Sequence, residues 1–216
     1  MADKRYYMAC VDLEGRSVLV VGGGRVALEK VEGLVDCGAS VTVVAPEIVD
    51  ALEHLDVELV RRRYRTSDLD GRFLVVAATS TPEVNRHVFG DAEARSLLCN
   101  VVDVPELCSF ILPAVHREDP IAVAISTGGA SPALAQRLRD DIAVVVRPEH
   151  AELARTLREL RPWAKANLDT YEARRDYFAG IVAAALGARR PHESDGGVVR
   201  LPPDPAVRPD TPLEAA

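Results

Sequence analysis

The sequence has few cysteines, no surplus of positive charge and no long hydrophobic run. Its 216 residues include four cysteines, and its 26 lysines and arginines are outnumbered by 33 aspartates and glutamates. The formal net charge of −7 argues against broad electrostatic binding to nucleic acid or to an anionic membrane. No stretch approaches the roughly 20 apolar residues that span a bilayer. We therefore expect no nucleic-acid partner and no membrane span.

The cysteines and histidines match no pattern of metal ligands. No two cysteines are spaced as CxxC, and no cysteine–histidine cluster has the spacing of a zinc or iron–sulfur site. We expect reduced thiols in a cytoplasmic protein and no bound metal. The charged start of the chain, Met1 to Arg5, also does not fit a signal peptide.

The first half of the chain alternates apolar runs with segments of helical periodicity. A run such as SVLVV at residues 17–21 suits a strand that is buried on both faces of a parallel sheet. Strands are expected at residues 17–21, 40–45, 57–60, 73–78 and 98–102. Helices are expected at residues 26–37 and from Pro82, with Thr81 as N-cap. This rhythm predicts an α/β fold with a Rossmann-type doubly wound parallel sheet.

The pattern changes after residue 112. One strand is expected at residues 121–125, and Ser131–Pro132 opens a helix that carries Leu134, Leu138 and Ile142 on one face. Residues 148–186 have an almost wholly helical pattern with a break before Pro162. The last stretch lacks apolar periodicity, which predicts a disordered tail. The predicted parts are a Rossmann domain at 1–112, a small unit at 113–148, a helical domain at 149–187 and a tail at 188–216.

A glycine-rich loop follows the first expected strand. Gly22, Gly24 and Ala27 fit the pattern G-x-G-x-x-A, in which the first glycine makes a tight turn and the second admits a pyrophosphate. The small third residue lets the helix pack on the strand, and the helix N-terminus offers free N–H groups to phosphates. A purely structural glycine turn is the alternative. The predicted cofactor residues of this loop are Gly22, Gly23, Gly24, Arg25 and Val26.

The end of the second expected strand bears on the choice of dinucleotide. An acidic residue about 20 positions after the loop usually binds the adenosine ribose. The nearest acid here is Glu47, 23 positions after Gly24 (47 − 24), so Pro46 and Glu47 are the predicted ribose contacts. Thr79 completes the predicted cofactor site. No arginine stands at this strand end to hold a 2′-phosphate, which favours NAD over NADP, and the arginine-rich run at residues 61–65 is interpreted as a solvated face.

Three segments together resemble a known family. They are GGGRVALEK at residues 22–30 with VTVVAPE at 41–47, CNVVDVPELCSFILPA at 99–114, and ISTGGASPALAQRLRDDI at 125–142. In this order they resemble the precorrin-2 dehydrogenase and sirohydrochlorin ferrochelatase family, which also forms the N-terminal half of sirohaem synthase. The resemblance covers about residues 5–180.

The resemblance implies an activity and an assembly. It implies NAD-dependent oxidation of precorrin-2, a tetrapyrrole, to sirohydrochlorin, and in some members the insertion of ferrous iron, as a further substrate, to give sirohaem. It also implies a homodimer in which residues 113–148 form the dimerisation unit. The elements after residue 112 are in any case too few to bury their own apolar faces. We do not expect the methyltransferase half of the larger enzyme in a chain of this length.

The resemblance matches Asp103 to the family's catalytic aspartate. Asp103 ends an expected strand at the edge where doubly wound sheets bind ligands, and a carboxylate placed there can act as a base. A turn or helix-cap aspartate is the alternative. A rival function for the chain is a Rossmann module that senses a nucleotide without catalysis, which would need neither Asp103 nor a substrate domain.

Further residues are predicted to bind the substrate. Asn100 and Ser109 belong to the same segment as Asp103. The backbone N–H groups of the glycine turn before the third segment's helix could bind substrate carboxylates, although an ordinary strand–turn–helix connection is the alternative. The predicted substrate residues of this turn are Thr127, Gly128, Gly129 and Ser131.

Overall fold

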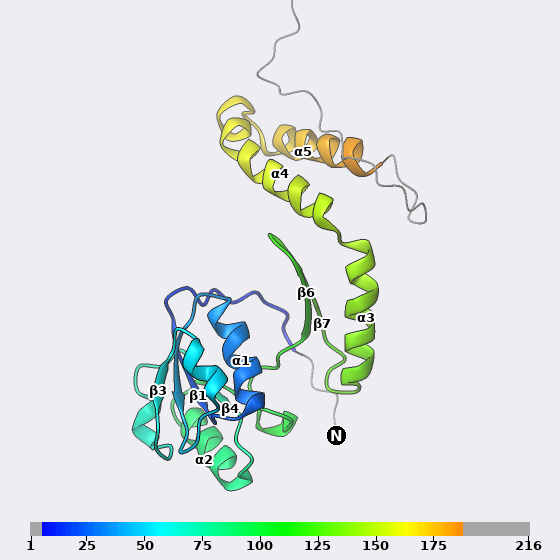
Figure 1. The fold of residues 1–216 in the computed structure, drawn as a ribbon. Coiled ribbons are helices and arrows are strands. Elements are labelled where there is room, and N and C mark those ends of the chain that lie inside the picture. The colour runs from blue at the N-terminus through cyan, green and yellow to red at the C-terminus, as the bar shows by residue number, and fades with distance from the viewer. Residues whose placement is uncertain (1–5, 188–216) are drawn as a thin grey trace, which may run out of the picture. The chain divides into compact units, whose positions relative to one another are not determined.

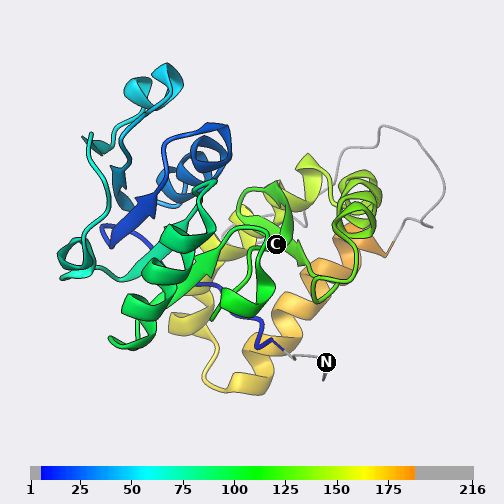
Figure 2. The same ribbon diagram turned by 90° about the horizontal axis from the view of Figure 1, so that it is seen from below.

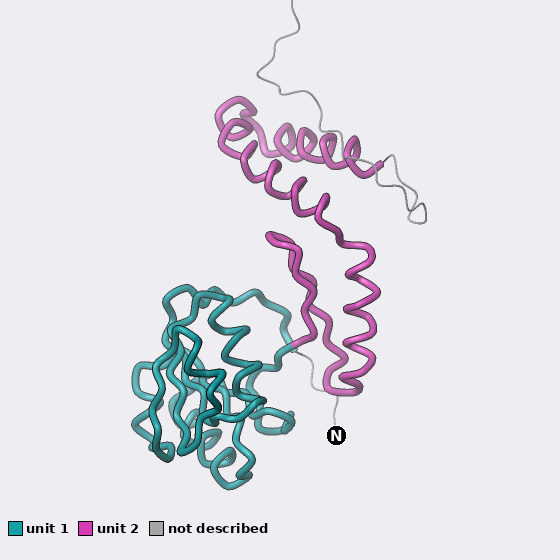
Figure 3. Tube along the Cα trace, viewed as in Figure 1, with its two compact units in different colours: residues 1–112 teal, residues 113–216 magenta. Residues whose placement is uncertain are grey.

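Residues 6–187 are described in the computed structural model, and the tail predicted at 188–216 lies outside them. The chain divides into unit 1, residues 1–112, and unit 2, residues 113–216 (Figure 3). Unit 1 contains a parallel sheet with its helices, and unit 2 contains a β-hairpin followed by helices.

Unit 1 is built on a sheet of five strands in the order β3-β2-β1-β4-β5 (Figure 1). All neighbouring strands are parallel. The chain runs outward from β1 to β3 and then crosses back to β4 on the other side of β1, which creates a topological switch point between β1 and β4. The predicted doubly wound parallel sheet is confirmed. The strands are β1 (Ser17–Val21), β2 (Ser40–Val44), β3 (Glu58–Val60), β4 (Leu74–Ala77) and β5 (Leu98–Val101).

Helices cover both faces of this sheet, and the strand side chains alternate between them. Val18 and Val20 of β1 belong to the core on the α1 face, whereas Leu19 and Val21 belong to the core on the α2 face. This period of two, with both faces buried, is typical of a parallel sheet. Ala27 has no exposed surface, so α1 packs closely on the sheet at the third position of the glycine motif. The helical elements are α1 (Arg25–Val35), α2 (Pro82–Glu93) and the short helices η1 (Asp50–His54), η2 (Thr66–Leu69) and η3 (Pro105–Leu107).

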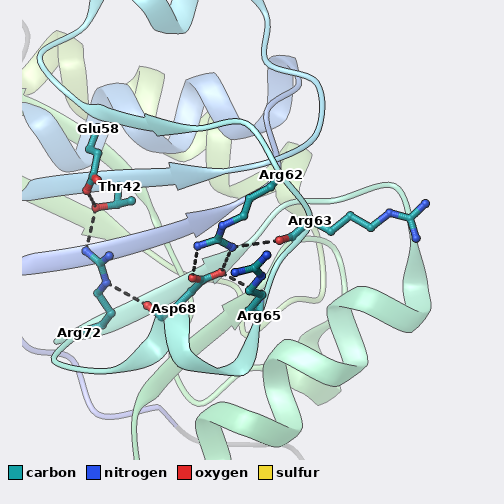
Figure 4. Close-up of polar contacts among 7 residues, drawn as sticks. All are labelled: Thr42, Glu58, Arg62, Arg63, Arg65, Asp68 and Arg72. Carbon is teal, nitrogen blue, oxygen red and sulfur yellow. Dashed lines mark hydrogen bonds and ion pairs between the residues drawn. The ribbon is translucent and has the colours of Figure 1, made fainter.

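A buried carboxylate holds the crossover from β3 to β4. Asp68 accepts two hydrogen bonds from the Arg62 guanidinium, at 2.8 and 2.6 Å, and a third from the backbone N–H of Arg65 at 2.8 Å (Figure 4). Arg72 donates to the carbonyl oxygen of Asp68 at 3.0 Å and to Ser17 Oγ at 2.9 Å. The hydrogen bonds from Arg62 hold the pKa of Asp68 below its ordinary value. The interpretation of the arginine-rich run as a solvated face is therefore wrong for Arg62.

Unit 2 opens with an antiparallel hairpin on which a helix packs. The first of its two strands was not expected from the sequence, which predicts only the second, at residues 121–125. The imidazole Nε2 of His116 donates to the carbonyl oxygen of Val146 at 3.1 Å, which joins the hairpin to the end of α3. Farther along, α4 and α5 lie against each other (Figures 1 and 2). The rings of Trp163 and Tyr177 join them, with centroids 5.4 Å apart. The elements are β6 (Ala114–Glu118), β7 (Ile121–Ile125), α3 (Pro132–Val145), α4 (Pro148–Asn167) and α5 (Tyr171–Leu186).

The helices of unit 2 correct one prediction and match another. α4 continues through Pro162, and the break falls at residues 168–170 instead. A proline removes one backbone hydrogen bond from a helix, but Pro162 does not end α4. The Thr170 hydroxyl then caps α5 by accepting the N–H of Ala173 at 3.1 Å, and Ser131 caps α3 as predicted. None of the helices within residues 6–187 is long and apolar enough to cross a membrane.

Candidate cofactor and active site

A pocket of about 1050 Å³ lies in unit 1 at the carboxyl edge of the sheet. Segments that follow all five strands line it, together with two positions on α2. This edge, beside the switch point, is where doubly wound sheets bind ligands. The pocket brings together all of the predicted cofactor residues and the predicted catalytic residue, which are Gly22, Gly23, Gly24, Arg25, Val26, Pro46, Glu47, Thr79 and Asp103.

The first two glycines of the loop are required by the packing of the loop itself. Gly22 has a φ of +126°, and a Cβ there would clash with the carbonyl group of Ala78. A Cβ on Gly23 would clash with the carbonyl oxygen of Glu47. The backbone N–H of Val49 donates to the Gly23 carbonyl oxygen at 2.9 Å. The loop is thus held between the chain that leaves β2 and the chain that leaves β4.

Gly24 is not required by the fold in this way. No atom lies within 4 Å of the position that its Cβ would occupy. Its φ of −88° and ψ of −173° are extended values that any residue adopts, and it is exposed at the N-cap of α1. The open side of Gly24 and the free N–H groups of the helix N-terminus together fit a pyrophosphate. Gly24 is therefore the glycine whose presence a ligand explains best.

Hydrogen bonds with an asparagine of α2 hold the loop that follows β4. The Thr79 hydroxyl donates to Asn85 Oδ1 at 2.7 Å, and Asn85 Nδ2 donates back to the Thr79 carbonyl oxygen at 3.0 Å. The N–H of Thr81 donates to the Thr79 hydroxyl at 3.1 Å. Thr81 occupies the predicted N-cap position of α2, but its side chain makes no capping bond. The hydroxyl of Thr79 therefore shapes this wall of the pocket.

Several residues that the sequence did not single out also line the pocket. Arg63 and Tyr64 follow β3, and His87 lies on α2. The rings of Tyr64 and His87 meet edge to face, with centroids 5.8 Å apart. The Tyr64 hydroxyl donates to Asp91 Oδ2 at 2.9 Å, and burial together with this bond raises the pKa of Tyr64 above its ordinary value. For Arg63 and Tyr64 the only signal in the sequence was that residues just after a parallel strand reach the ligand edge.

Asp103 follows β5 in a tight turn whose backbone is unusual. Its φ of +61° lies in the left-handed region, which a residue other than glycine rarely adopts. Hydrogen bonds on either side hold the turn, from the Val102 N–H to the Ala77 carbonyl oxygen and from the Val104 N–H to the Val101 carbonyl oxygen. The Asp103 side chain is exposed. Backbone conformations of this kind concentrate at functional sites, which favours a role in the pocket over a simple turn.

Asn100 and Ser109 do not line this pocket. Asn100 is 7% exposed, and its Nδ2 donates to the carbonyl oxygen of Phe110 at 3.0 Å. The Ser109 hydroxyl accepts the backbone N–H of Cys99 at 2.7 Å. Both side chains fasten the segment after Asp103 back onto β5. Within residues 6–187, no three histidine, cysteine, aspartate or glutamate side chains form a group that could hold a metal ion.

The glycine turn predicted to bind substrate belongs to unit 2, whereas the pocket belongs to unit 1. Gly128 and Gly129 have φ values of +63° and +88°, so both adopt the left-handed conformation that glycine allows. The Thr127 hydroxyl accepts the N–H of Ser131 at 3.1 Å, and the Ser131 hydroxyl accepts the N–H of Leu134 at 3.1 Å. These bonds form an ordered turn at the N-terminus of α3.

The fold and the pocket define a dinucleotide-binding protein of the Rossmann class. Residues 9–114 match the family described as “Putative NAD(P)-binding”, and residues 118–144 match “Sirohaem biosynthesis protein central”. A solved structure, SirC, precorrin-2 dehydrogenase, is similar with a TM-score of 0.69 and 28% identity, over 82% of this chain and 89% of that one.

Curated relatives extend this similarity. The chain is 40% identical over 182 residues to a siroheme synthase of Pseudomonas entomophila, which covers 82% of this chain and 39% of the relative. It is 39% identical over 179 residues to the siroheme synthase of Methylobacillus flagellatus, which covers 81% of this chain and 38% of the relative. The chain thus spans about two fifths of the length of these relatives. It belongs to the family of precorrin-2 dehydrogenases and sirohaem synthases.

Proposed function

We propose that the chain is an NAD-dependent dehydrogenase that oxidises precorrin-2 to sirohydrochlorin in sirohaem biosynthesis. The observation that carries this proposal is one pocket that joins the open side of Gly24 to the exposed carboxylate of Asp103. The likeness to a precorrin-2 dehydrogenase and to siroheme synthases supports the choice of a tetrapyrrole substrate.

The glycine loop and the end of β2 would hold the dinucleotide. The pyrophosphate would lie against Gly24 and the N-terminus of α1, next to Arg25 and Val26. Pro46 and Glu47 would contact the adenosine ribose, because the Glu47 carboxylate can accept hydrogen bonds from ribose hydroxyls. NAD, when bound, supplies the hydride acceptor. We propose NAD rather than NADP as the cofactor, since Glu47 would repel a 2′-phosphate.

Asp103 would serve as the base. Oxidation of precorrin-2 removes a hydride and a proton, so that precorrin-2 and NAD⁺ give sirohydrochlorin, NADH and H⁺. The Asp103 carboxylate would accept the proton from a ring carbon as the hydride leaves another. Asn100 and Ser109 would act as positioning residues, because they fix the segment that carries Asp103.

The substrate carries several acetate and propionate side chains. The turn before α3, which contains Thr127, Gly128, Gly129 and Ser131, would bind such carboxylates. The N–H groups of Gly128 and Ser131 already donate to hydroxyls within the turn, so the Gly129 N–H and the N-terminus of α3 would make these bonds. We further propose that Asp103 accepts pyrrole N–H protons when ferrous iron, as a substrate, is inserted into sirohydrochlorin. That insertion releases the pyrrole protons, so it needs the same kind of acceptor.

Residues 113–148 would form a homodimer interface. Four apolar side chains of α3 are exposed rather than packed in a core, with exposures of 50% for Leu134, 41% for Leu138, 75% for Val144 and 63% for Val145. The adjoining sheet has two strands, and a two-stranded hairpin is marginally stable without further cover. A two-fold partner would cover these surfaces.

A paired assay of the purified chain tests the proposed function. Precorrin-2 with NAD should give NADH and sirohydrochlorin, and sirohydrochlorin with ferrous ion should give sirohaem at a rate above the protein-free control. NAD binding without turnover of precorrin-2 would favour the nucleotide-sensing alternative. Failure to bind NAD at all would overturn both the dehydrogenase and the sensor.

A further inference from the structure

Two opposite charges stand at equivalent places on neighbouring strand ends. The register of β2 and β3 pairs Val44 with Val60. Glu47 and Arg63 each come three residues after these paired positions (47 − 44 and 63 − 60). Both residues lie beyond the paired part of the strands, in the loops that leave this carboxyl edge of the sheet. Both are exposed and both line the pocket.

Arg63 differs from the arginines that precede it in the run. Arg61 is ion-paired with Glu53, and Arg62 is bound to the buried carboxylate of Asp68. The Arg63 side chain points away from Asp68 (Figure 4), and its guanidinium makes no hydrogen bond or ion pair with any residue in the range 6–187. Its backbone is nevertheless fixed, since its carbonyl oxygen accepts a hydrogen bond from Arg62 at 3.0 Å.

Glu47 is also without an ion-pair partner among the described residues, and no ion pair joins it to Arg63. The same pocket is therefore lined by an unpaired carboxylate from the end of β2 and an unpaired guanidinium from the end of β3. In Rossmann folds, an acid at the end of the second strand binds the ribose 2′-hydroxyl, whereas a nearby arginine accommodates a 2′-phosphate. In this chain an acid, Glu47, and an arginine, Arg63, both line the pocket. Arg25, the other arginine of the pocket, is the first residue of α1 and belongs to the pyrophosphate loop.

We propose that the Arg63 guanidinium is positioned to bind the 2′-phosphate of NADP and that the negative charge of Glu47 prevents this binding. This inference rests on the proposed function as a dinucleotide-dependent enzyme. A guanidinium binds phosphate oxygens through charge-assisted, bidentate hydrogen bonds, and a neighbouring carboxylate repels the same phosphate. Selectivity for NAD then comes from repulsion by Glu47 rather than from the lack of a phosphate partner. The sequence has no arginine at the end of β2, but in the structure Arg63, which follows β3, lines the same pocket.

A double-mutant cycle with NAD and NADP tests this proposal. Dissociation constants are measured by calorimetry for the wild-type chain, Glu47→Gln, Arg63→Met and the double variant. Glu47→Gln should tighten NADP binding at least about tenfold, because a neutral amide leaves Arg63 free to bind the phosphate. The same change made in the Arg63→Met chain should tighten NADP binding clearly less, because it relieves the repulsion by Glu47 but leaves no guanidinium to bind the phosphate. The tighter NADP binding of Glu47→Gln should weaken as the salt concentration is raised, because salt screens the attraction between exposed Arg63 and the 2′-phosphate.

The ion pair of Arg61 with Glu53 supplies matched controls. Arg61→Met and Glu53→Gln change the net charge in the same way, but neither residue lines the pocket, so NADP binding should stay near the wild-type value. An equal gain from Glu47→Gln with and without Arg63 would overturn the proposal, and so would no gain at all. In either case NAD binding by the wild-type chain would leave the proposed function standing. A wild-type chain that binds neither dinucleotide would overturn both.

Discussion

Replacing Gly24 by alanine tests whether the glycine loop is shaped by a ligand or by the fold. No atom lies within 4 Å of the added Cβ, and alanine readily adopts the φ of −88°. The change should cost at most about 1 kcal/mol of folding free energy, the scale of a change at a helix N-cap. Gly22→Ala would instead set a Cβ against the Ala78 carbonyl group at a φ of +126°. Strain and overpacking together should cost roughly 2–6 kcal/mol.

The two variants should separate stability from binding. In Gly24→Ala the methyl group occupies the space proposed for the pyrophosphate, so NAD should bind at least about tenfold more weakly, or about 1.4 kcal/mol. Gly24→Asp should abolish binding, because its carboxylate would face the phosphates. Urea unfolding measures the free energy of unfolding, and calorimetry measures NAD binding. A folded Gly24→Ala chain that binds NAD within about threefold of the wild type would refute the reasoning.

Burial, charge and exposed apolar surface lead to the remaining predictions. Arg62 holds the folded-state pKa of Asp68 below the unfolded value near 3.9, so the stabilisation is present above that pH and is lost as the pH falls through the folded pKa. Between pH 7 and pH 3, the free energy of unfolding measured in urea should therefore fall less in Asp68→Asn than in the wild type. At pH 7, Asp68→Asn should melt at least about 4 °C below the wild type. Burial raises the pKa of the Cys99 thiol to about 12, so iodoacetamide near pH 8 should alkylate the exposed Cys10 and spare Cys99, as mass spectrometry would show. Light scattering at micromolar concentration should give twice the chain mass, and a 23.4 kDa monomer would contradict a dimer through residues 113–148.

Much of unit 1 could be predicted because its local signals agree. Each strand is a short apolar run, and the turn into α1 has glycines where the backbone needs them. Gly22 and Gly23 are required by contacts with neighbouring chain, while Gly24 is not, and the sequence alone could not distinguish these two reasons. The position of Asp103 after β5 was predictable, but its left-handed backbone was not, because aspartate favours that conformation only weakly.

The misses in unit 2 and in the pocket have physical causes. The segment AVHRE of β6 carries two charged residues and a histidine, so it lacks the apolar run by which the other strands were predicted. Pro162 predicted a break, yet α4 continues because the helix tolerates the loss of one hydrogen bond there. Arg63 lay in a charged run that looks solvated, and only the folded structure shows that it lines the same pocket as Glu47.

Single-turnover formation of NADH by Asp103→Asn tests most directly whether Asp103 is the base of this pocket. The variant keeps the size of the side chain and removes its charge, and the glycine loop that would hold NAD lies in a separate segment. Glu106→Gln is a matched control, since Glu106 is an exposed acid of η3 that does not line the pocket. At saturating NAD, Asp103→Asn should form NADH about 100-fold more slowly than the wild type, while Glu106→Gln and NAD binding by both variants stay unchanged. An Asp103→Asn chain that turns over within about threefold of the wild type would make Asp103 a turn residue and contradict its role as the base.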